Sequence, residues 1–242
     1  MKINQISILK QFTNITYSFT SKNDGNLAFH VNDDIDLVNK NHQDLAKKLN
    51  YDKNKLVHMK QVHSNKIQIL TEQDNYLSPP TCDALITNKI HTPLMVMVAD
   101  CAPILFYDDI KKVIAVAHAG RSGVFQNIVQ TTLSSFINDF NSSIDNIYVA
   151  IGANIHSCCY EVGSEIYDEA MLLGLGYALQ PRDNKYLLNI NAILKKQLLL
   201  AGIDEKNIEE SNECTLCKKD KYFSYRHKKD NGRFAGVIYL NN

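Results

Sequence analysis

Three residues at the ends of apolar segments carry side chains that bind metals. Cys101 follows the run PLMVMVAD, His118 ends the run KKVIAVAH, and His63 lies in HMKQVHSNKI, where Ser64-Asn65 indicates a turn. We expect each at the end of a strand. Two imidazoles and a thiolate suit Zn²⁺ and also copper, and three protein ligands leave a fourth position for a water that ionises near neutral pH. Spacings of 38 and 17 residues form no local motif, so the fold must bring the three together.

The turn after His118 has the features of an anion-binding site. In VAHAGRSGVFQNIV, Gly120 and Gly123 flank Arg121 and Ser122, and an amphipathic helix is predicted to begin just beyond them. Unpaired backbone N–H groups and the helix dipole favour an anion at such a turn, and Arg121 adds a positive charge. The alternative is an ordinary tight turn in which the glycines serve only backbone geometry.

The cysteines allow two other sites. Cys101 and His118 alone would form the nucleophile–base pair of a cysteine hydrolase. Cys214 and Cys217 form a CxxC, which together with the pair Cys158-Cys159 would supply the ligands of a structural zinc. No second CxxC follows at zinc-ribbon spacing, so half-buried thiols beside the final strand are the preferred interpretation.

Composition excludes several classes of protein. The chain has 242 residues, 45% of them hydrophobic, and its 26 basic and 26 acidic residues balance. No charge excess indicates a nucleic-acid or membrane surface, and we expect neither as a partner. The N-terminal stretch lacks the apolar segment of a signal peptide, and no window approaches a membrane span, so we expect a cytoplasmic protein. No repeat or linker divides the chain, which predicts one domain over residues 1–242.

Strands and helices are predicted to position these side chains. Strands are expected at Lys66–Leu70, Leu94–Ala99, Ile104–Tyr107, Val113–His118, Ile147–Ile151 and Gly236–Leu240. We expect Pro103 to interrupt the strand just beyond Cys101. Helices are expected at Asp36–Leu49, Val124–Phe140, Gly163–Leu173 and Ile190–Ala201. The elements do not alternate strictly, and neither a GxGxxG nor a P-loop is present, which favours an α+β fold over a Rossmann-type domain.

Six motifs in a fixed order resemble one known family. They are MKQVHSNKI, CDALIT, VADCAPILFYD, VAHAGRSG, IGANIHSCCYEVG and CTLCKKDKYFSYRHKKDNGR. Together they look like the laccase-domain family, also called the multicopper polyphenol oxidase or purine nucleoside phosphorylase family. The resemblance extends from about Tyr17 to Leu240, which is nearly the whole chain.

The resemblance implies a fold, a metal site and an activity. The fold would be a single mixed α/β domain with two mixed sheets flanked by helices. The histidines of QVH and HAG and the cysteine of ADC, here His63, His118 and Cys101, would hold a metal and form the catalytic centre. Similar proteins convert adenosine, inosine, guanosine and methylthioadenosine, with phosphate, to a free base and a ribose 1-phosphate, and they deaminate adenosine. We therefore expect a zinc enzyme, with nucleoside and phosphate as its small-molecule partners, as a monomer or small homo-oligomer.

Two departures from the family pattern concern phosphate. The family usually reads HAGWRG, whereas this chain has Arg121 in the tryptophan position and Ser122 in the arginine position. Lys22 stands where an arginine is usual, and lysine lacks the bidentate fork that fits phosphate. Together with Gly120 and Arg121, we expect Lys22, His30 and Arg226 to contact phosphate or nucleoside. For His30 a structural role in fixing a loop is an equal alternative, and for Arg226 a surface ion pair is.

Other functions remain open on the sequence. Copper-dependent oxidation of phenols is the main alternative, although a laccase needs several histidine-rich sites and the chain has eight scattered histidines. A binding module that keeps the fold without turnover is another, favoured only by the altered HAGRSG turn. Asp83 in CDALIT would orient the ribose or a ligand histidine, or cap a buried turn. Asp100 is expected to stabilise a turn or to contact a metal ligand without itself binding the metal.

Overall fold

Twelve strands form three sheets in the part of the chain that the structure, a computed structural model, describes: residues 6–230 and 232–241. The large sheet contains β11 (Ile208–Glu210), β7 (Ile147–Ile151), β5 (Ala102–Asp108), β6 (Val113–Ala119), β3 (Ala84–Thr87) and β2 (Ile67–Ile69), in spatial order. Its two edge pairs, β11 with β7 and β2 with β3, are parallel, and the other pairs are antiparallel.

Two smaller antiparallel sheets complete the set. The first, called here the small sheet, contains β1 (Ile15–Phe19), β12 (Phe234–Leu240) and β4 (Leu94–Val98), with β12 in the centre. The second contains β8 (Glu161–Val162), β10 (Lys185–Leu188) and β9 (Leu179–Arg182). The expected mixed α/β class is confirmed. The expected pair of mixed sheets is corrected to three sheets, of which only the largest is mixed.

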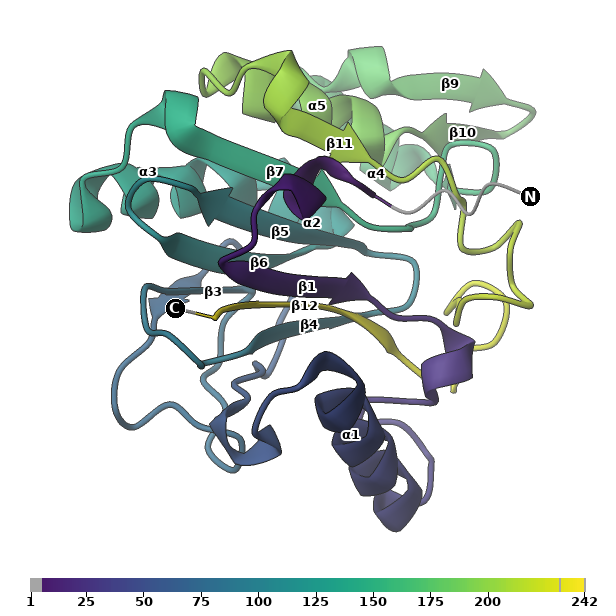
Figure 1. The fold of residues 1–242 in the computed structure, drawn as a ribbon. Helices are drawn as coiled ribbons and strands as arrows, with labels where there is room; N and C mark the ends of the chain where they lie inside the picture. Colours follow the sequence, from purple (N-terminus) through teal and green to yellow (C-terminus); the bar gives the residue numbers. More distant parts are fainter. Residues whose placement is uncertain (1–5, 231, 242) are drawn as a thin grey trace.

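Four layers follow from the alternation of apolar side chains along the strands. On β6, Ala115 and Ala117 face one hydrophobic core and Val116 faces another, so both sides of the large sheet are buried. The first core lies under α2 (Arg121–Phe125), α3 (Ile128–Phe140), α4 (Ser164–Leu172) and α5 (Ile190–Leu200). The second lies between the large and small sheets. On the outer face of the small sheet packs α1 (Ile35–Leu49), as Figure 1 shows.

Local sequence explains where α1 begins and ends. The side chain of Asp34 accepts hydrogen bonds from the backbone N–H groups at the first turn, and Asn50 adopts the left-handed conformation that ends a helix. Between them Val38, His42, Leu45 and Ala46 form the buried stripe expected of helical periodicity. In residues 6–230 and 232–241, none of the helices combines the length and the apolar character that crossing a bilayer requires.

The predicted helix Val124–Phe140 is wrong at its start. The chain forms a short helix, α2, directly after Gly120, and α3 begins only at Ile128. Asn127 separates them with a φ of 57°, and its side-chain oxygen accepts a hydrogen bond from the backbone N–H of Gln130. An asparagine that tolerates this conformation and caps the next helix explains the break.

Pro103 does not interrupt a strand, as was predicted, but lies inside β5 opposite His118. Its carbonyl accepts a hydrogen bond from the backbone N–H of Gly152, on the side where β7 is the neighbour. Since β7 ends at Ile151, the N–H that proline lacks would point beyond the end of the ladder. Proline is tolerated at such a position. The crossing from β4 in the small sheet to β5 in the large one therefore contains Ala99, Asp100 and Cys101.

Candidate active site

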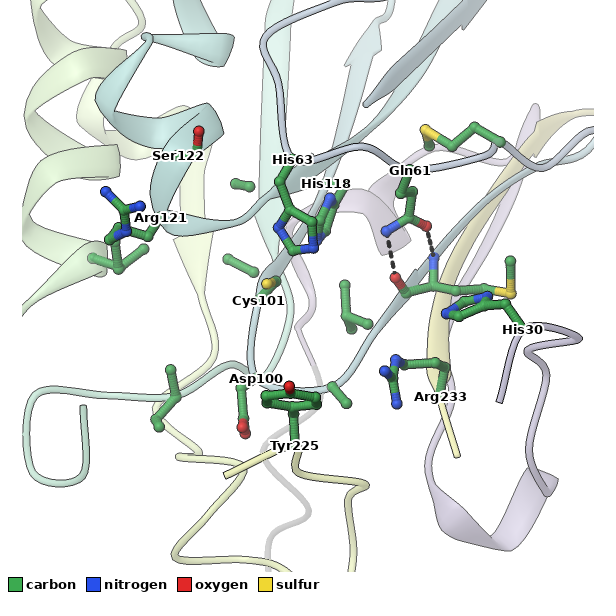
Figure 2. Close-up of a pocket in the computed structure, with 18 of the residues that line it drawn as sticks. His30, Gln61, His63, Asp100, Cys101, His118, Arg121, Ser122, Tyr225 and Arg233 are labelled. Atoms are coloured by element: carbon green, nitrogen blue, oxygen red, sulfur yellow. Dashed lines mark hydrogen bonds between the residues drawn. The ribbon is translucent and has the colours of Figure 1, made fainter. Parts of the chain in front are cut away.

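Three side chains from distant parts of the sequence meet where the chain crosses from the small sheet to the large sheet. One ligand atom from each of His63, Cys101 and His118 lies within 4.8 Å of the others. Figure 2 shows the two imidazole rings above the thiol. The ring centroids are 4.7 Å apart and the rings are inclined at 73°. His118 is buried in β6, Cys101 immediately precedes β5, and His63 is on the exposed side of the group.

His63 lies in a turn and not at the end of a strand, so that expectation was wrong. Its φ is 59°, which is uncommon for a histidine. The turn is held by Asp83, whose carboxylate accepts hydrogen bonds from the backbone N–H groups of His63 at 3.0 Å and Ser64 at 2.7 Å, and from the Ser64 hydroxyl at 2.7 Å. These bonds fix the left-handed backbone that directs the His63 ring toward Cys101 and His118.

Asp83 also orients His118. One carboxylate oxygen lies 2.8 Å from His118 Nδ1, and both side chains are buried. Burial alone raises the pKa of Asp83, but the hydrogen bonds from His118 and Ser64 outweigh it and lower the pKa to about 2. An ionised carboxylate only accepts hydrogen bonds, so Nδ1 carries the proton and Nε2 is the ring nitrogen available as a ligand. Both roles considered for this aspartate, the cap and the orienting of a histidine, occur together.

The thiol and the imidazole polarise each other. Burial raises the pKa of Cys101, but the adjacent His118 and His63 outweigh it and lower the pKa to about 6. Burial lowers the pKa of His118, but the Cys101 sulfur and the hydrogen bond to Asp83 outweigh it and raise the pKa to about 9. In the absence of a metal, a thiolate beside an imidazolium is the favoured form at neutral pH, and His118 Nε2 would give up its proton when a metal binds. A thiolate is also the form of cysteine that binds metals.

The space around Gly120 fits a metal. A Cβ added there would lie 2.9 Å from His63 Nδ1 and 3.1 Å from Cys101 Sγ, closer than side chains pack. The missing side chain therefore keeps the donor atoms accessible. One thiolate and two imidazoles match the donor set of three-ligand zinc sites, and they also suit copper. By donor set and by space, these residues fit the metal that the motifs predicted.

A cavity of about 960 Å³ opens in front of the three side chains, at the upper end of the size range of small-molecule sites. Its lining is mixed: apolar and aromatic side chains form part of the wall, and cationic and ionisable groups form another part. The apolar part includes Phe29, Met59, Met97, Ile155, Tyr160 and Tyr225. Beyond the three side chains and Asp100, the other groups are His30, His58, Lys60, Arg121, Arg226 and Arg233. Such a lining suits a ligand with a flat ring at one end and negative charge at the other.

The residues predicted to bind phosphate or nucleoside differ in their placement. Arg121 lines the cavity, but its guanidinium forms an ion pair with Glu169 on α4. Arg226 and His30 also line the cavity, and Arg226 lies 5.1 Å over the ring of Tyr160. Burial, followed by the charge of Arg233, lowers the pKa of His30, which favours the neutral ring.

Lys22 lies elsewhere. It is not among the described residues that line the cavity, and its ammonium donates a hydrogen bond to the carbonyl of Lys219 at 2.6 Å. It also sits 5.4 Å from the centre of the Phe223 ring. These contacts hold the loop that contains Lys22 against residues near the C-terminal end of the chain, so the placement gives no support to its predicted phosphate contact.

Several lining residues were missed in the sequence. Gln61, two residues before His63, exchanges hydrogen bonds with the backbone of Met97, at 2.8 and 3.0 Å (Figure 2). This pairing ties the turn before β2 to the small sheet. In the sequence, the sign of this role was that Gln61 is the first residue of the QVH motif. Arg233 and Tyr225 lie in the segment before β12, where the run of charges reads as a solvated turn.

Asp100 is a structural group with a left-handed backbone, φ 83°. Its carboxylate accepts hydrogen bonds from the Thr215 hydroxyl at 2.6 Å and from the backbone N–H of Arg226 at 2.7 Å. Its carbonyl accepts one from the backbone N–H of Ile155 at 2.8 Å. The aspartate beside Cys101 therefore fixes two loops of the cavity wall, in keeping with the predicted turn-stabilising role.

Comparison with known proteins identifies relatives over nearly the whole chain. Residues 13–241 match the family described as multi-copper polyphenol oxidoreductase laccase. A purine nucleoside phosphorylase of Corynebacterium glutamicum is 33% identical over 217 residues, which are 89% of this chain and 86% of the relative. The purine nucleoside phosphorylase YlmD of Bacillus subtilis is 29% identical over 240 residues, which are 91% of this chain and 85% of the relative.

Solved structures have the same fold. The crystal structure of the hypothetical protein YfiH of Bacillus licheniformis matches with a TM-score of 0.89 at 29% identity, over 96% of this chain and 94% of that one. The structure of YlmD from Geobacillus stearothermophilus matches with a TM-score of 0.86 at 28% identity, over 96% and 93%. With the ordered motifs and the cavity they surround, these matches show that the chain belongs to the multi-copper polyphenol oxidoreductase laccase family, whose members include proteins named purine nucleoside phosphorylases.

Proposed function

We propose that this protein is a zinc-dependent purine nucleoside phosphorylase. It would convert adenosine, inosine, guanosine or methylthioadenosine, with phosphate, to the free base and a ribose 1-phosphate. The observation that carries the proposal is the convergence of His63, Cys101 and His118 at one end of the cavity. Relatives named purine nucleoside phosphorylases, at about 30% identity, support the choice of reaction.

The metal would be held by the thiolate of Cys101, Nε2 of His118 and the ring of His63. When bound, zinc would act as a Lewis acid toward an oxygen of the substrate or of water. Asp83 keeps the proton on His118 Nδ1 and so keeps Nε2 directed at the metal position. The same centre supports an accompanying deamination of adenosine, in which water and not phosphate is the second reactant.

Phosphate would bind among the arginines that line the cavity. Arg226 and Arg233 come from the segment before β12, and Arg121 comes from the start of α2. A planar guanidinium matches two phosphate oxygens at once. Since Arg121 is paired with Glu169, its full charge is not available to the anion. We therefore assign it a smaller share of phosphate binding than the HAGRSG motif alone indicates.

The base and ribose would occupy the rest of the cavity. The rings of Phe29, Tyr160 and Tyr225 provide flat apolar surface on which a purine stacks. His30, with its pKa lowered, presents a neutral ring that both donates and accepts hydrogen bonds. Phe29 and His30 belong to one loop, so a single segment contributes both kinds of contact.

The test is phosphate-dependent release of hypoxanthine from inosine by the purified, zinc-loaded protein. The expected result is release that requires phosphate and is lost in Cys101→Ala. Cys82→Ala is the matched control, because Cys82 is a buried thiol in the core between the sheets and does not line the cavity. No release with zinc, together with oxidation of a phenol with copper, would replace the proposal by a copper oxidase. Inactivity in both assays would favour a binding module.

A cysteine hydrolase is the second candidate, and one observation favours it. Asp83, His118 and Cys101 form a chain of carboxylate, imidazole and thiolate like that of a nucleophilic triad. His63, which such a triad does not need, favours the metal. The two functions respond differently to a chelator: a hydrolase keeps its activity after metal removal and loses it on alkylation of Cys101, whereas the zinc enzyme loses activity when the metal is removed.

A further inference from the structure

A second group of thiols lies outside the cavity. Cys158 and Cys159 follow β7 in the turn before β8, and Cys214 and Cys217 lie in the turn after β11. Although the pairs are more than fifty residues apart, all four Sγ atoms lie within 4.8 Å of one another. We call these four residues the thiol cluster. The preferred interpretation of the sequence, half-buried thiols beside the final strand, did not anticipate that the two pairs meet.

The sulfur–sulfur distances match a tetrahedral metal site. Cys217 Sγ lies 3.6 Å from Cys158 Sγ and 3.4 Å from Cys159 Sγ, and the latter two are 3.7 Å apart. Four thiolates at the usual zinc–sulfur distance of about 2.3 Å stand about 3.8 Å from one another at the corners of a tetrahedron. A disulfide would bring two sulfurs to about 2.05 Å. We propose that the thiol cluster binds one zinc ion, in a closed site separate from the centre in the cavity.

The backbone around the cluster is arranged for this role. Cys214 Sγ accepts a hydrogen bond from the backbone N–H of His156 at 3.4 Å. The backbone N–H of Thr215 donates to the carbonyl of Asn154 at 2.9 Å, next to an isolated bridge between Asn154 and Cys214. The backbone contacts of Asn154 with Cys214 and Thr215 dock one turn on the other independently of the sulfurs. The four ligands are therefore held near their positions before the ion binds, which lowers the entropic cost of binding.

Charge and protons balance at the site. Each thiol loses its proton to solvent when it binds, so four protons leave and the zinc with its four thiolates carries two negative charges. Lys218 and Lys219 directly follow Cys217, and these two positive charges offset that excess. No oxidant is needed for this step.

The site would hold a wall of the cavity in place. Residues 211–230 form turns and one isolated bridge, without any helix or strand. They nevertheless supply Tyr225 and Arg226 to the cavity. Tyr160, which directly follows Cys159, lines the cavity from the other turn. With four protein ligands the ion has no open position, so its role is structural. The zinc-bound cluster would then hold these two turns together, as a hydrophobic core holds larger elements together.

The test counts zinc in a chain whose cavity site is disabled. The variant His63→Ala/Cys101→Ala is purified in reducing buffer without added metal, and zinc is measured by mass spectrometry. We expect one zinc ion per chain, falling to a trace when Cys158→Ser/Cys217→Ser is added. These two thiols are exposed, so serine there costs the fold little. Adding Cys82→Ala instead, which removes a thiol elsewhere, should leave one zinc ion per chain.

A cobalt titration of the His63→Ala/Cys101→Ala variant, which keeps all four thiols of the cluster, covers the case in which the added serines disturb folding. Four thiolates should give the intense sulfur-to-cobalt absorption of tetrahedral coordination, with saturation at one ion per chain. Zinc content that is unchanged by Cys158→Ser/Cys217→Ser in a folded chain would overturn the proposal. So would a disulfide between Cys217 and either of its neighbours, found by alkylating the thiols at cell lysis and mapping the peptides. All these readouts are independent of phosphorylase activity, so the two proposals fail separately.

Discussion

Replacing Asp83 by asparagine should both destabilise the protein and weaken metal binding. One carboxylate oxygen accepts hydrogen bonds from His63 N and His118 Nδ1, and the other accepts from Ser64 N and the Ser64 hydroxyl. An asparagine presents one oxygen and one NH₂ group, so in either orientation its NH₂ faces at least one backbone N–H. A buried donor left without a partner costs about 1–3 kcal/mol, and loss of the bonds to a charged acceptor adds to this. We expect a loss of about 3 kcal/mol in the free energy of unfolding.

The effect on the metal depends on the tautomer of His118. If the new NH₂ group faces Nδ1, that nitrogen accepts a hydrogen bond and the ring proton moves to Nε2, which then cannot bind a metal. In the opposite orientation His118 keeps its partner, but the turn that contains His63 loses its anchor. Loss of such a supporting partner weakens metal binding by about 10- to 100-fold. Both orientations of the new amide in Asp83→Asn therefore lower the affinity.

Two assays measure these effects. Urea unfolding of the metal-free protein gives the change in stability, and competition with a chromogenic chelator gives the zinc affinity. The matched control is Asp108→Asn at the other end of β5. Asp108 is also fully buried, but one oxygen accepts hydrogen bonds from both Ile110 N and Lys111 N, and the other has no partner among the described residues. Asparagine fits there, so we expect a smaller loss and unchanged zinc affinity. Equal stability and zinc affinity in Asp83→Asn and the wild type would refute the reasoning.

Three further predictions use other parts of the structure. Gly120→Ala should lower the zinc content of the cavity site without unfolding the protein, because the added Cβ would lie 2.9 Å from His63 Nδ1. Full zinc occupancy in this variant would contradict the argument that the space beside Gly120 keeps the metal ligands accessible. Burial lowers the pKa of His42 to about 4, so its neutral ring stabilises the fold above pH 6.5 and this stability is lost as the pH falls toward 4. Between pH 7 and pH 5 the free energy of unfolding, measured with urea, should fall by about 2 kcal/mol because of His42. The His42→Gln variant should not show this decrease. Glu169→Gln should lower the phosphate concentration needed for half-maximal activity by freeing Arg121, and Arg121→Gln should raise it; a rise in both variants would show instead that the intact pair is needed.

The sequence predicted the elements whose patterns are long or strongly apolar. The helix at Asp36–Leu49 and the strand at Val113–His118 are found within one residue of their expected bounds. The strands at Ala84–Thr87 and Glu161–Val162 were missed because four residues or fewer carry no period. Their conformation comes from neighbouring strands that lie far away in the sequence.

The three metal-binding candidates of the site were predicted from the sequence, and its supporting residues only in part: roles for Asp83 and Asp100 were expected, but their partners were not identified. His63, Cys101 and His118 were identified by residue type and by their motifs, and the structure brings them together. The left-handed turn at His63 depends on Asp83, twenty residues later, and pairs of this kind leave no local signal. The ion pair of Arg121 with Glu169 is equally non-local.

The place of β12 in the small sheet affects how the protein is made. This strand follows all the others in the chain, yet it is the central strand of that sheet, between β1 and β4. During synthesis β1 and β4 are translated long before their shared partner, and they have no hydrogen-bonding partner between them until it leaves the ribosome. The sheet that supports Gln61 through Met97 therefore forms late, from contacts of large sequence separation, which fold slowly. A ribosome that stalls just before Phe234 would leave a chain with most of its helices but without a finished cavity, and with two exposed strand edges open to aggregation.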